Sequence, residues 1–230
     1  MSAIIEVSHI TKRYGKETVL DDVSLSFEEG KIHGIIGRNG SGKTMLFKTI
    51  CGFVKPTEGK VTVRGKQVGK DVDFPKDVGL IIETPGFLPY FSGFKNLQLL
   101  ASLTGKIGDE GVRVAMERVG LDPKMKKSVR KYSLGMNQRL GIAQAIMEDP
   151  GILVLDEPMN GLDNQGVADM RSLFLKLKEE GKTILLASHN REDIAALCDT
   201  VTEMDRGKVI ARSGFEEAPK EKPEGPRPDA

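Results

Sequence analysis

Short hydrophobic runs recur along the chain, separated by polar or glycine-containing segments. Several runs are continuous and rich in Val, Ile and Leu, which is typical of strands buried on both faces of a parallel sheet. Others alternate hydrophobic and polar residues, as antiparallel strands with one solvated face do. The expected strands are 4–7, 23–27, 32–36, 61–63, 78–82, 152–155, 183–187, 201–204 and 208–211.

Helical spacing is clear in the second half of the chain. Hydrophobic residues recur every three or four positions at Val167, Met170, Leu173, Phe174 and Leu177. Gly181 follows them as a stop signal. Strands that alternate with helices in this way indicate a mixed α/β layer fold with a parallel core.

The segment 85–148 differs, because its hydrophobic residues fit helices and no convincing strand occurs in it. We expect a helical subdomain there, inserted into one domain that spans residues 1–213. Residues 214–230 are rich in proline and charge, which predicts a disordered tail. An uninvolved terminus is favoured over a regulatory or partner-binding tail.

A glycine-rich segment follows the expected strand 32–36 and precedes a helix expected to begin at Lys43. It has the phosphate-binding pattern G-x-x-x-x-G-K-[ST] and comprises Gly37, Arg38, Asn39, Gly40, Ser41, Gly42, Lys43 and Thr44. Its glycines let backbone N–H groups converge on one point, next to the positive end of the helix. Lys43 is expected to bind the β- and γ-phosphates, and the Thr44 hydroxyl to ligate Mg²⁺. The strand–loop–helix context predicts nucleotide binding.

A second motif ends the expected strand 152–155 with two acids, Asp156 and Glu157. Ligands of parallel sheets bind at the C-terminal ends of the strands. Asp156 is expected to hold Mg²⁺, directly or through water, and Glu157 to orient and deprotonate the attacking water. The alternative is a strand that ends in solvated acids. The phosphate-binding loop in the same chain favours the functional interpretation.

Composition narrows the function classes further. The 34 Lys and Arg residues nearly balance 33 Asp and Glu, so general nucleic-acid binding is not expected. Cys51 and Cys198 lack metal-ligand spacing and are expected to be reduced thiols of a cytoplasmic protein. No hydrophobic run approaches the length of a membrane span, so any membrane role is expected to come through a partner.

A segment between the two nucleotide motifs is the first family-specific feature. It reads Tyr132-Ser133-Leu134-Gly135-Met136 and is followed by Gln138 and Arg139. It resembles the ABC signature LSGGQ with its Gln-Arg pair: Ser133 and Gly135 match, whereas Tyr132, Leu134 and Met136 depart. Ser133 can also cap a helix and form an anion site with nearby N–H groups. In the family this site faces a γ-phosphate held by the other subunit.

Over about residues 3–213 the chain resembles the nucleotide-binding subunit of ABC transporters. The resemblance implies a P-loop NTPase of RecA-like fold, with a mixed sheet core, an antiparallel β subdomain and an inserted helical subdomain. Asp163 resembles the acid of the D-loop, which crosses the dimer interface. His189 resembles the switch histidine, which contacts the γ-phosphate and the catalytic glutamate. Tyr14 resembles the A-loop aromatic, which stacks on adenine.

Glu83 departs from the family pattern, which usually has glutamine after the corresponding strand. The family residue touches Mg²⁺ or the attacking water and begins the loop to the helical subdomain. A carboxylate can still ligate a hard cation through water, but it adds negative charge near the γ-phosphate. We expect Glu83 to keep the coupling role, with weaker ATP affinity or a greater demand for Mg²⁺.

The resemblance implies a cycle in which two subunits, identical or different, close around two MgATP. Ser133 and Gly135 of each chain would contact the γ-phosphate held by the other. It also implies an integral membrane permease as partner, no nucleic acid, and a cytoplasmic position on the inner face of the cell membrane. The motifs do not encode the cargo, the identity of the permease or the choice between homodimer and heterodimer.

Other functions remain as alternatives. A soluble ABC ATPase could act in iron–sulfur assembly or in nucleic-acid- or ribosome-linked mechanics, although the chain has neither the long coiled-coil insert of DNA-repair members nor the second cassette of translation-factor members. A nucleotide-gated binding module conflicts with the intact set Lys43, Asp156, Glu157 and His189. The signature form and Glu83 resemble bacterial exporter-type ATPases, so export is favoured over import.

Overall fold

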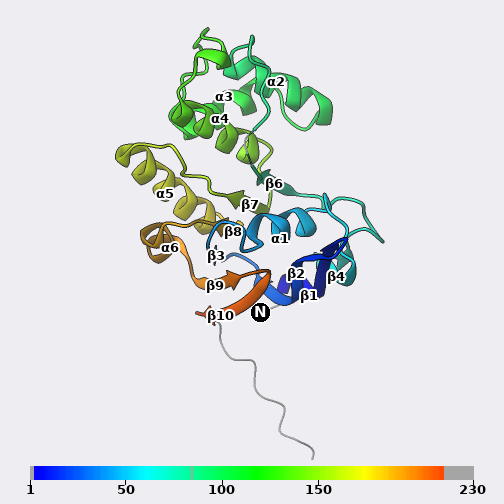
Figure 1. The fold of residues 1–230 in the computed structure, drawn as a ribbon. Helices are drawn as coiled ribbons and strands as arrows, with labels where there is room; N and C mark the ends of the chain where they lie inside the picture. The colour runs from blue at the N-terminus through cyan, green and yellow to red at the C-terminus, as the bar shows by residue number, and fades with distance from the viewer. Residues whose placement is uncertain (1–2, 84, 215–230) are drawn as a thin grey trace, which may run out of the picture.

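The computed structural model describes residues 3–83 and 85–214 of the chain. A six-stranded sheet with the order β10-β9-β3-β8-β7-β6 forms its centre (Figure 1). Its strands are β3 (Ile32–Ile36), β6 (Val78–Ile81), β7 (Ile152–Asp156), β8 (Thr183–Ala187), β9 (Thr200–Asp205) and β10 (Lys208–Ser213). All neighbouring pairs are parallel except β9 and β10. The parallel core predicted from the continuous hydrophobic runs is therefore confirmed.

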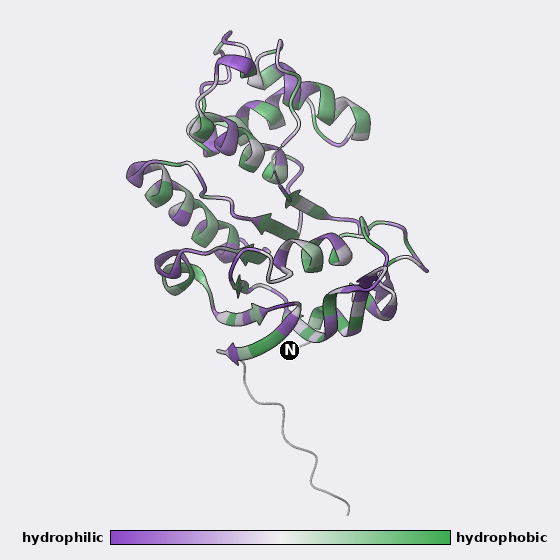
Figure 2. Ribbon diagram, viewed as in Figure 1, coloured by the Kyte–Doolittle hydropathy of each residue, from purple (hydrophilic) through white to green (hydrophobic). Residues whose placement is uncertain are grey.

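The inner strands are hydrophobic on both faces because each face packs against a separate core (Figure 2). On β7, Leu153 and Leu155 belong to the core shared with the helices α4 (Leu134–Ile146) and α5 (Asn164–Glu179). Ile152 and Val154 point the other way, into the core shared with α1 (Lys43–Ile50) and the antiparallel sheet. Burial on both sides fixes the strand ends that form the candidate site.

The second sheet is antiparallel and has the order β2-β1-β4-β5. Its strands are β1 (Ala3–Tyr14), β2 (Glu17–Glu28), β4 (Glu58–Val63) and β5 (Lys66–Gln67). β1 and β2 are longer than expected. One face of this antiparallel sheet accepts polar residues, so each strand continues beyond the hydrophobic run from which it was predicted. β5 was not expected; it pairs with β4 through a two-residue turn in which Arg64 and Gly65 have φ of 47° and 74°.

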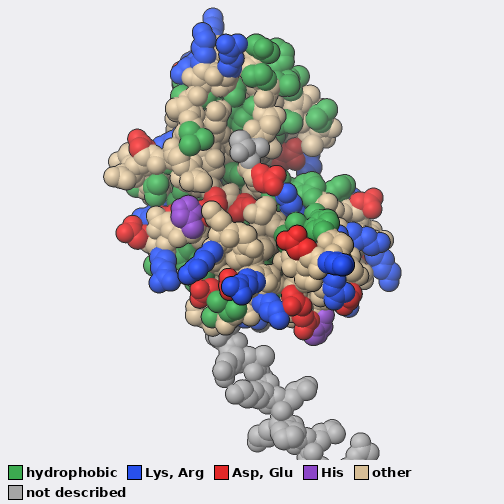
Figure 3. All heavy atoms as spheres, in the orientation of Figure 1, with side chains coloured by type: hydrophobic (Ala, Val, Ile, Leu, Met, Phe, Trp, Pro, Cys, Tyr) green, Lys and Arg blue, Asp and Glu red, His purple; other side chains and the backbone are tan. Residues whose placement is uncertain are grey.

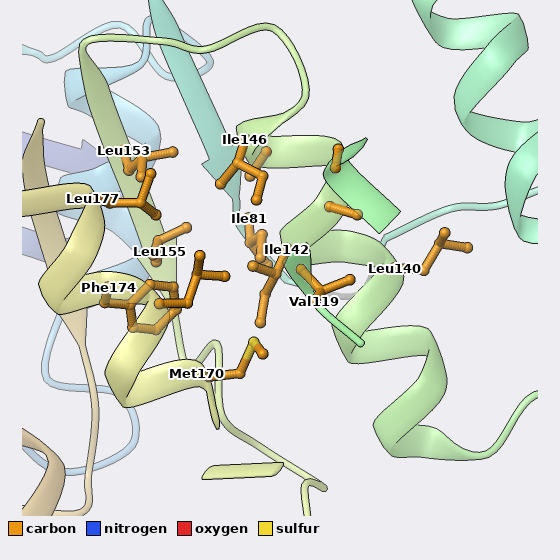
Figure 4. Close-up of a cluster of buried hydrophobic side chains, with 14 of the residues drawn as sticks. Ile81, Val119, Leu140, Ile142, Ile146, Leu153, Leu155, Met170, Phe174 and Leu177 are labelled. Atoms are coloured by element: carbon orange, nitrogen blue, oxygen red, sulfur yellow. The ribbon is translucent and has the colours of Figure 1, made fainter. Parts of the chain in front are cut away.

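The chain between β6 and β7 contains α2 (Gly93–Thr104), α3 (Asp109–Arg118), the short 3₁₀ helix η1 (Val129–Lys131) and α4, and we call α2–α4 the helical segment. It lies beyond the β6 edge of the main sheet (Figure 1). Figure 4 shows how it is joined to the sheet: Ile142 and Ile146 of α4 meet Leu155 of β7 and Met170 of α5 in one buried cluster. The start of α4 is thereby placed relative to the strand ends.

Other sequence expectations are met where the structure describes them. Strands 32–36 and 183–187 have the expected bounds, and α1 begins at Lys43. Both cysteines are free thiols; Cys51 is buried and Cys198 is half-buried. The expected tail 214–230 lies outside the described residues except for Gly214. The helices of residues 3–83 and 85–214 include none with the length and hydrophobicity of a bilayer span.

Candidate nucleotide site

The phosphate-binding loop links the end of β3 to the start of α1. Gly37 has φ of 154°, and a Cβ there would lie 2.3 Å from the Met204 carbonyl oxygen and 2.4 Å from Ser41 Oγ, so the position requires glycine. Gly42 caps α1 in a left-handed conformation with φ of 105°. The loop therefore delivers its backbone directly into the N-terminus of α1, where unpaired N–H groups attract anions.

Lys43 reaches back over the loop from the first position of α1. Its Nζ donates to the Gly37 carbonyl at 2.7 Å and to the Arg38 carbonyl at 3.3 Å, and the residue is only 6% exposed. An ammonium group has three donors, so one remains for a phosphate oxygen. The geometry holds a positive charge at the mouth of the loop, as the sequence pattern requires.

Thr44 and Asp156 meet across the cleft although they are distant in sequence. The Thr44 hydroxyl donates to Asp156 Oδ2 at 2.5 Å. Burial raises the pKa of the Asp156 carboxyl, while the Thr44 hydroxyl and the Lys43 ammonium act in the opposite direction. Glu83 also raises this pKa and Lys48 lowers it, so both groups are electrostatically linked to Asp156. Hydroxyl and carboxylate oxygens are ligands that suit Mg²⁺, so Thr44 and Asp156 could hold this ion.

Glu157 and His189, expected to act in hydrolysis, lie together just after the ends of β7 and β8. The Glu157 Oε2 atom lies 2.8 Å from His189 Nδ1. Glu157 has φ of 50°, so the backbone turns left-handed directly after the strand, and its N–H still bonds the Ala187 carbonyl at 2.9 Å. Gln138 of α4 donates from Nε2 to the Glu157 carbonyl at 3.2 Å. His189 therefore contacts the carboxylate of Glu157, while Gln138 and Ala187 hold its backbone.

These groups surround a cleft of about 700 Å³. Figure 3 shows acidic side chains and a histidine gathered across the middle of this face, between the helical segment and the sheets. The expected residues that line the cleft are Asn39, Gly40, Ser41, Gly42, Lys43, Thr44, Glu83, Asp156 and Glu157. A volume of this size is typical of small-molecule sites.

Other expected site residues lie outside this lining. Tyr14 ends β1 with half of its surface exposed, and the Lys12 ammonium lies 4.7 Å from its ring centroid. Arg38 contributes its carbonyl to Lys43, and His189 reaches the site through Glu157. Asp163 caps α5 by accepting from the Gly166 N–H at 2.9 Å.

The signature segment begins α4 at the rim of the cleft. Ser133 is the N-cap and accepts from the Met136 N–H at 3.2 Å, as expected from its residue type. Neither Ser133 nor Gly135 lines the cleft of its own chain, whereas Leu134 does and is 65% exposed. A Cβ on Gly135 would lie 3.1 Å from the Gly161 carbonyl oxygen, so the signature packs closely on the loop before α5.

The structure adds cleft residues that the sequence analysis did not single out. Lys48 lies one helical turn after Thr44 on α1, and its Nζ donates to Glu83 Oε1 at 2.6 Å. Asn137 of α4 lines the cleft with a buried Oδ1 atom that has no hydrogen-bond partner. The spacing of four residues from Thr44 could have indicated Lys48, because such residues share one helix face. Nothing in the local sequence marks Asn137.

The loop, the two acids at the end of β7 and the parallel sheet together define a P-loop ATPase. A family model described as ABC transporter matches residues 20–160, which is more than half of the chain. The chain therefore belongs to the ABC transporter family of ATP-binding proteins.

Several characterised and uncharacterised relatives agree with this assignment. The chain is 48% identical to YybJ of Bacillus subtilis, an uncharacterised ABC transporter ATP-binding protein, over 90% of this chain and 94% of YybJ. It is 42% identical to the bacitracin transport ATP-binding protein BcrA of Enterococcus faecalis, over 94% of this chain and 71% of BcrA. It is 33% identical to the lantibiotic transport ATP-binding protein SrtF of Streptococcus pyogenes, over 93% and 92% of the two chains.

Solved structures give the same fold. A nucleotide-free ATP-binding cassette from an ABC transporter superposes with a TM-score of 0.80 at 27% identity, covering 94% of this chain and 93% of that one. A dimeric bacterial ABC transporter cassette has a TM-score of 0.82 at 24% identity, covering 90% and 97%. The expected fold class, the ATP ligand and the ATPase activity are confirmed by this family membership.

Proposed function

We propose that the protein powers an exporter as one of two ATPase subunits on the cytoplasmic face of the cell membrane, with a separate permease as the membrane-spanning partner. The observation that carries this proposal is the incompleteness of each cleft. Lys43, Thr44 and Asp156 converge in one chain, whereas Ser133 and Gly135 lie outside the cleft of that chain. A second copy or a related subunit would supply them, as the dimeric cassette with the same fold supports.

In the proposed dimer each chain's own groups perform the hydrolysis. Glu157 accepts the proton of the attacking water, and His189 holds that carboxylate and faces the γ-phosphate. Lys43 and the N-terminus of α1 stabilise the charge that develops on the transferred phosphoryl group. Thr44 and Asp156 would hold Mg²⁺, which supplies charge neutralisation across the β- and γ-phosphates. Loss of the γ-phosphate removes the bridge between the subunits, so they separate.

Exposed hydrophobic side chains that follow Glu83 in the sequence support a protein partner there. We call them the docking face; they are Leu88, Tyr90 and Phe91, and Tyr90 is 78% exposed. Phe53 and Phe74 form a second exposed pair, with ring centroids 5.7 Å apart beside a groove of about 310 Å³. Exposed patches of this kind usually mark interaction sites. We assign the docking face to a cytoplasmic segment of the permease.

Basic residues next to the docking face favour a position at the membrane surface. They are Lys124, Lys126, Lys127, Arg130 and Lys131, all exposed. The segment is tied to the docking face because the Val129 N–H donates to the Phe91 carbonyl at 2.8 Å. Figure 3 shows Lys and Arg side chains beside hydrophobic ones at the end of the helical segment. Cationic groups of this kind are attracted by anionic headgroups of the inner leaflet.

Capture of the permease tests the docking face. Tyr90→Glu should abolish co-purification with a membrane-spanning protein encoded beside this chain, while ATP binding stays unchanged. Leu103→Glu is the matched control, because Leu103 is 82% exposed at the end of α2 outside the docking face. Equal capture by wild type and Tyr90→Glu would remove the assignment. If wild type captures no membrane-spanning protein at all, a soluble role is indicated instead.

Export is supported by the relatives named for bacitracin and lantibiotic transport. Everted membrane vesicles that contain the subunit and its permease expose the ATPase to the medium. ATP-dependent uptake of bacitracin or a lantibiotic into such vesicles would mean export from cells. Uptake confined to right-side-out vesicles would mean import and would contradict the proposal.

A further inference from the structure

Glu83 has a partner in this structure, and that partner lies inside the cleft. Its Oε1 atom accepts from Lys48 Nζ at 2.6 Å, and both residues line the same cleft as Thr44 and Asp156. Glu83 has φ of 63°, so its backbone is in the left-handed region that non-glycine residues rarely adopt. The loop conformation and the ion pair together aim the carboxylate at α1.

The position of Lys48 follows from the helix that also carries the phosphate-binding groups. Lys48 lies four residues after Thr44, so the two side chains leave α1 on the same face. The Thr44 hydroxyl points to Asp156, and the Lys48 ammonium points to Glu83. One face of α1 therefore contacts two carboxylates from two different strand ends, Asp156 at the end of β7 and Glu83 two residues after β6.

The two carboxylates differ in what they can reach. Asp156 already lies with the Thr44 hydroxyl, so a hard cation bound there would find two oxygen donors together. A released Glu83 carboxylate would add a third donor and a second negative charge to the same place. Glu83 and Lys48 line the same cleft as Thr44 and Asp156, so the charge of either side chain acts on that position. Lys48 therefore opposes the charge that Glu83 brings to the cleft.

We infer that Lys48 is a positioning residue that holds Glu83 away from the cation position at Thr44 and Asp156. Lys48 thereby offsets the negative charge that the Glu83 carboxylate brings to the cleft. The inference rests on the proposed metal role of Asp156. It predicts that Glu83 contributes little to cation binding while Lys48 is present and becomes a ligand once Lys48 is removed.

A double-mutant cycle on Mn²⁺ binding tests this inference. Mn²⁺ replaces Mg²⁺ as the probe, and electron paramagnetic resonance measures its Kd in the presence of ADP, independently of hydrolysis. Glu83→Gln should change the Kd less than about 2-fold when Lys48 is present. In the Lys48→Met background the same change should weaken Mn²⁺ binding at least about 10-fold, a typical cost of losing a group that supports a metal. Equal factors in the two backgrounds would overturn the inference.

Three further variants keep the result unambiguous. Lys48→Arg retains the cation and should behave as wild type even if Lys48→Met folds poorly. Lys106→Met removes a lysine that pairs with Glu148 at 3.0 Å, remote from the cleft lining, and should leave the Kd unchanged. Asp156→Asn should lose Mn²⁺ binding. If Asp156→Asn still binds Mn²⁺, the proposed metal role of Asp156 fails. If Asp156→Asn is impaired but Glu83→Gln changes the Kd by the same factor in both backgrounds, only the role of Lys48 is refuted.

Discussion

The two walls of the cleft are built differently. One wall, which we call the strand wall, consists of the phosphate-binding loop, the start of α1 and the end of β7, a strand buried on both faces. Its polar groups are paired: Thr44 bonds Asp156, and Glu157 bonds His189, which lies outside the lining. The other wall is the start of α4, where Leu134 is exposed and Asn137 has a buried, unpaired oxygen. The first wall gathers the groups expected to bind phosphate, whereas the second has an exposed leucine and an unpaired buried oxygen.

This difference separates the steps that one chain is expected to perform alone from those expected to need two associated chains. Groups on the strand wall are preorganised by the core, so their loss should act on nucleotide binding or on the chemical step in any oligomeric state. Groups on the α4 wall should matter only when subunits associate. Each of the following variants tests one side of that division.

Loss of the loop cation should have the largest effect. Lys43→Ala removes the ammonium that is held over the loop by the Gly37 and Arg38 carbonyls. We expect ATP affinity to fall about 100-fold, which matches the loss of hydrogen bonds to a charged group, and hydrolysis to disappear with it. Fluorescent-nucleotide titration of the isolated subunit measures the affinity. Affinity within 3-fold of wild type would show that the loop backbone alone binds the phosphates.

Loss of the general base should separate chemistry from binding on the same wall. Glu157→Gln keeps the shape and the contact with His189 but removes the proton acceptor. Hydrolysis should fall about 1,000-fold, within the usual range for a general base, while ATP still binds. Light scattering should then detect an ATP-dependent dimer. A variant that stays monomeric with ATP, with and without the permease, would contradict the two-chain site.

The strand wall could be predicted from sequence because its motifs are local. Lys43 and Thr44 follow β3 through the glycine-rich loop, Asp156 ends β7 and Glu157 comes next, so each motif and its strand place these residues. Lys48 with Glu83 could not be predicted in that way, because the partners lie 35 residues apart and meet only through the packing of α1 on the sheet. The unpaired Asn137 oxygen depends likewise on how α4 packs. β5 was missed because two residues carry no periodic pattern.

The α4 wall is tested by comparing two helix caps of equal geometry. Ser133 caps α4 and Ser92 caps α2, each accepting a backbone N–H at 3.2 Å. Replacement by alanine should cost about 1 kcal/mol of stability at either site. Only Ser133→Ala should also reduce hydrolysis, by about 10-fold, since a charge-assisted bond to the γ-phosphate of the partner is lost. ATP affinity of the isolated subunit should not change. Equal hydrolysis by the two variants would restrict Ser133 to capping.

The smallest expected effect concerns His33, which fixes β3 beneath the phosphate-binding loop. Its Nε2 lies 2.8 Å from the Glu28 carbonyl and its Nδ1 lies 2.7 Å from Thr200 Oγ1. Burial lowers the pKa of His33 below its ordinary value of 6.5. Below pH 6.5 the folded chain therefore binds fewer protons than the unfolded chain. The stability that neutral His33 contributes is present at neutral pH and is lost as the pH falls from 6.5 through the pKa of His33 in the folded chain.

His33→Gln isolates that contribution. Wild type should melt at a higher temperature than the variant at neutral pH, because the variant loses the ring contact with Phe27 at 5.2 Å between centroids as well as a neutral hydrogen-bonded group. The difference in Tm should narrow as the pH is lowered, since only wild type must then charge a buried imidazole or unfold. Thermal melts of the two proteins across this pH range measure it. A Tm difference that stays constant with pH would mean that the fold tolerates a charged His33. The preorganisation of the strand wall would then depend on the hydrophobic core alone.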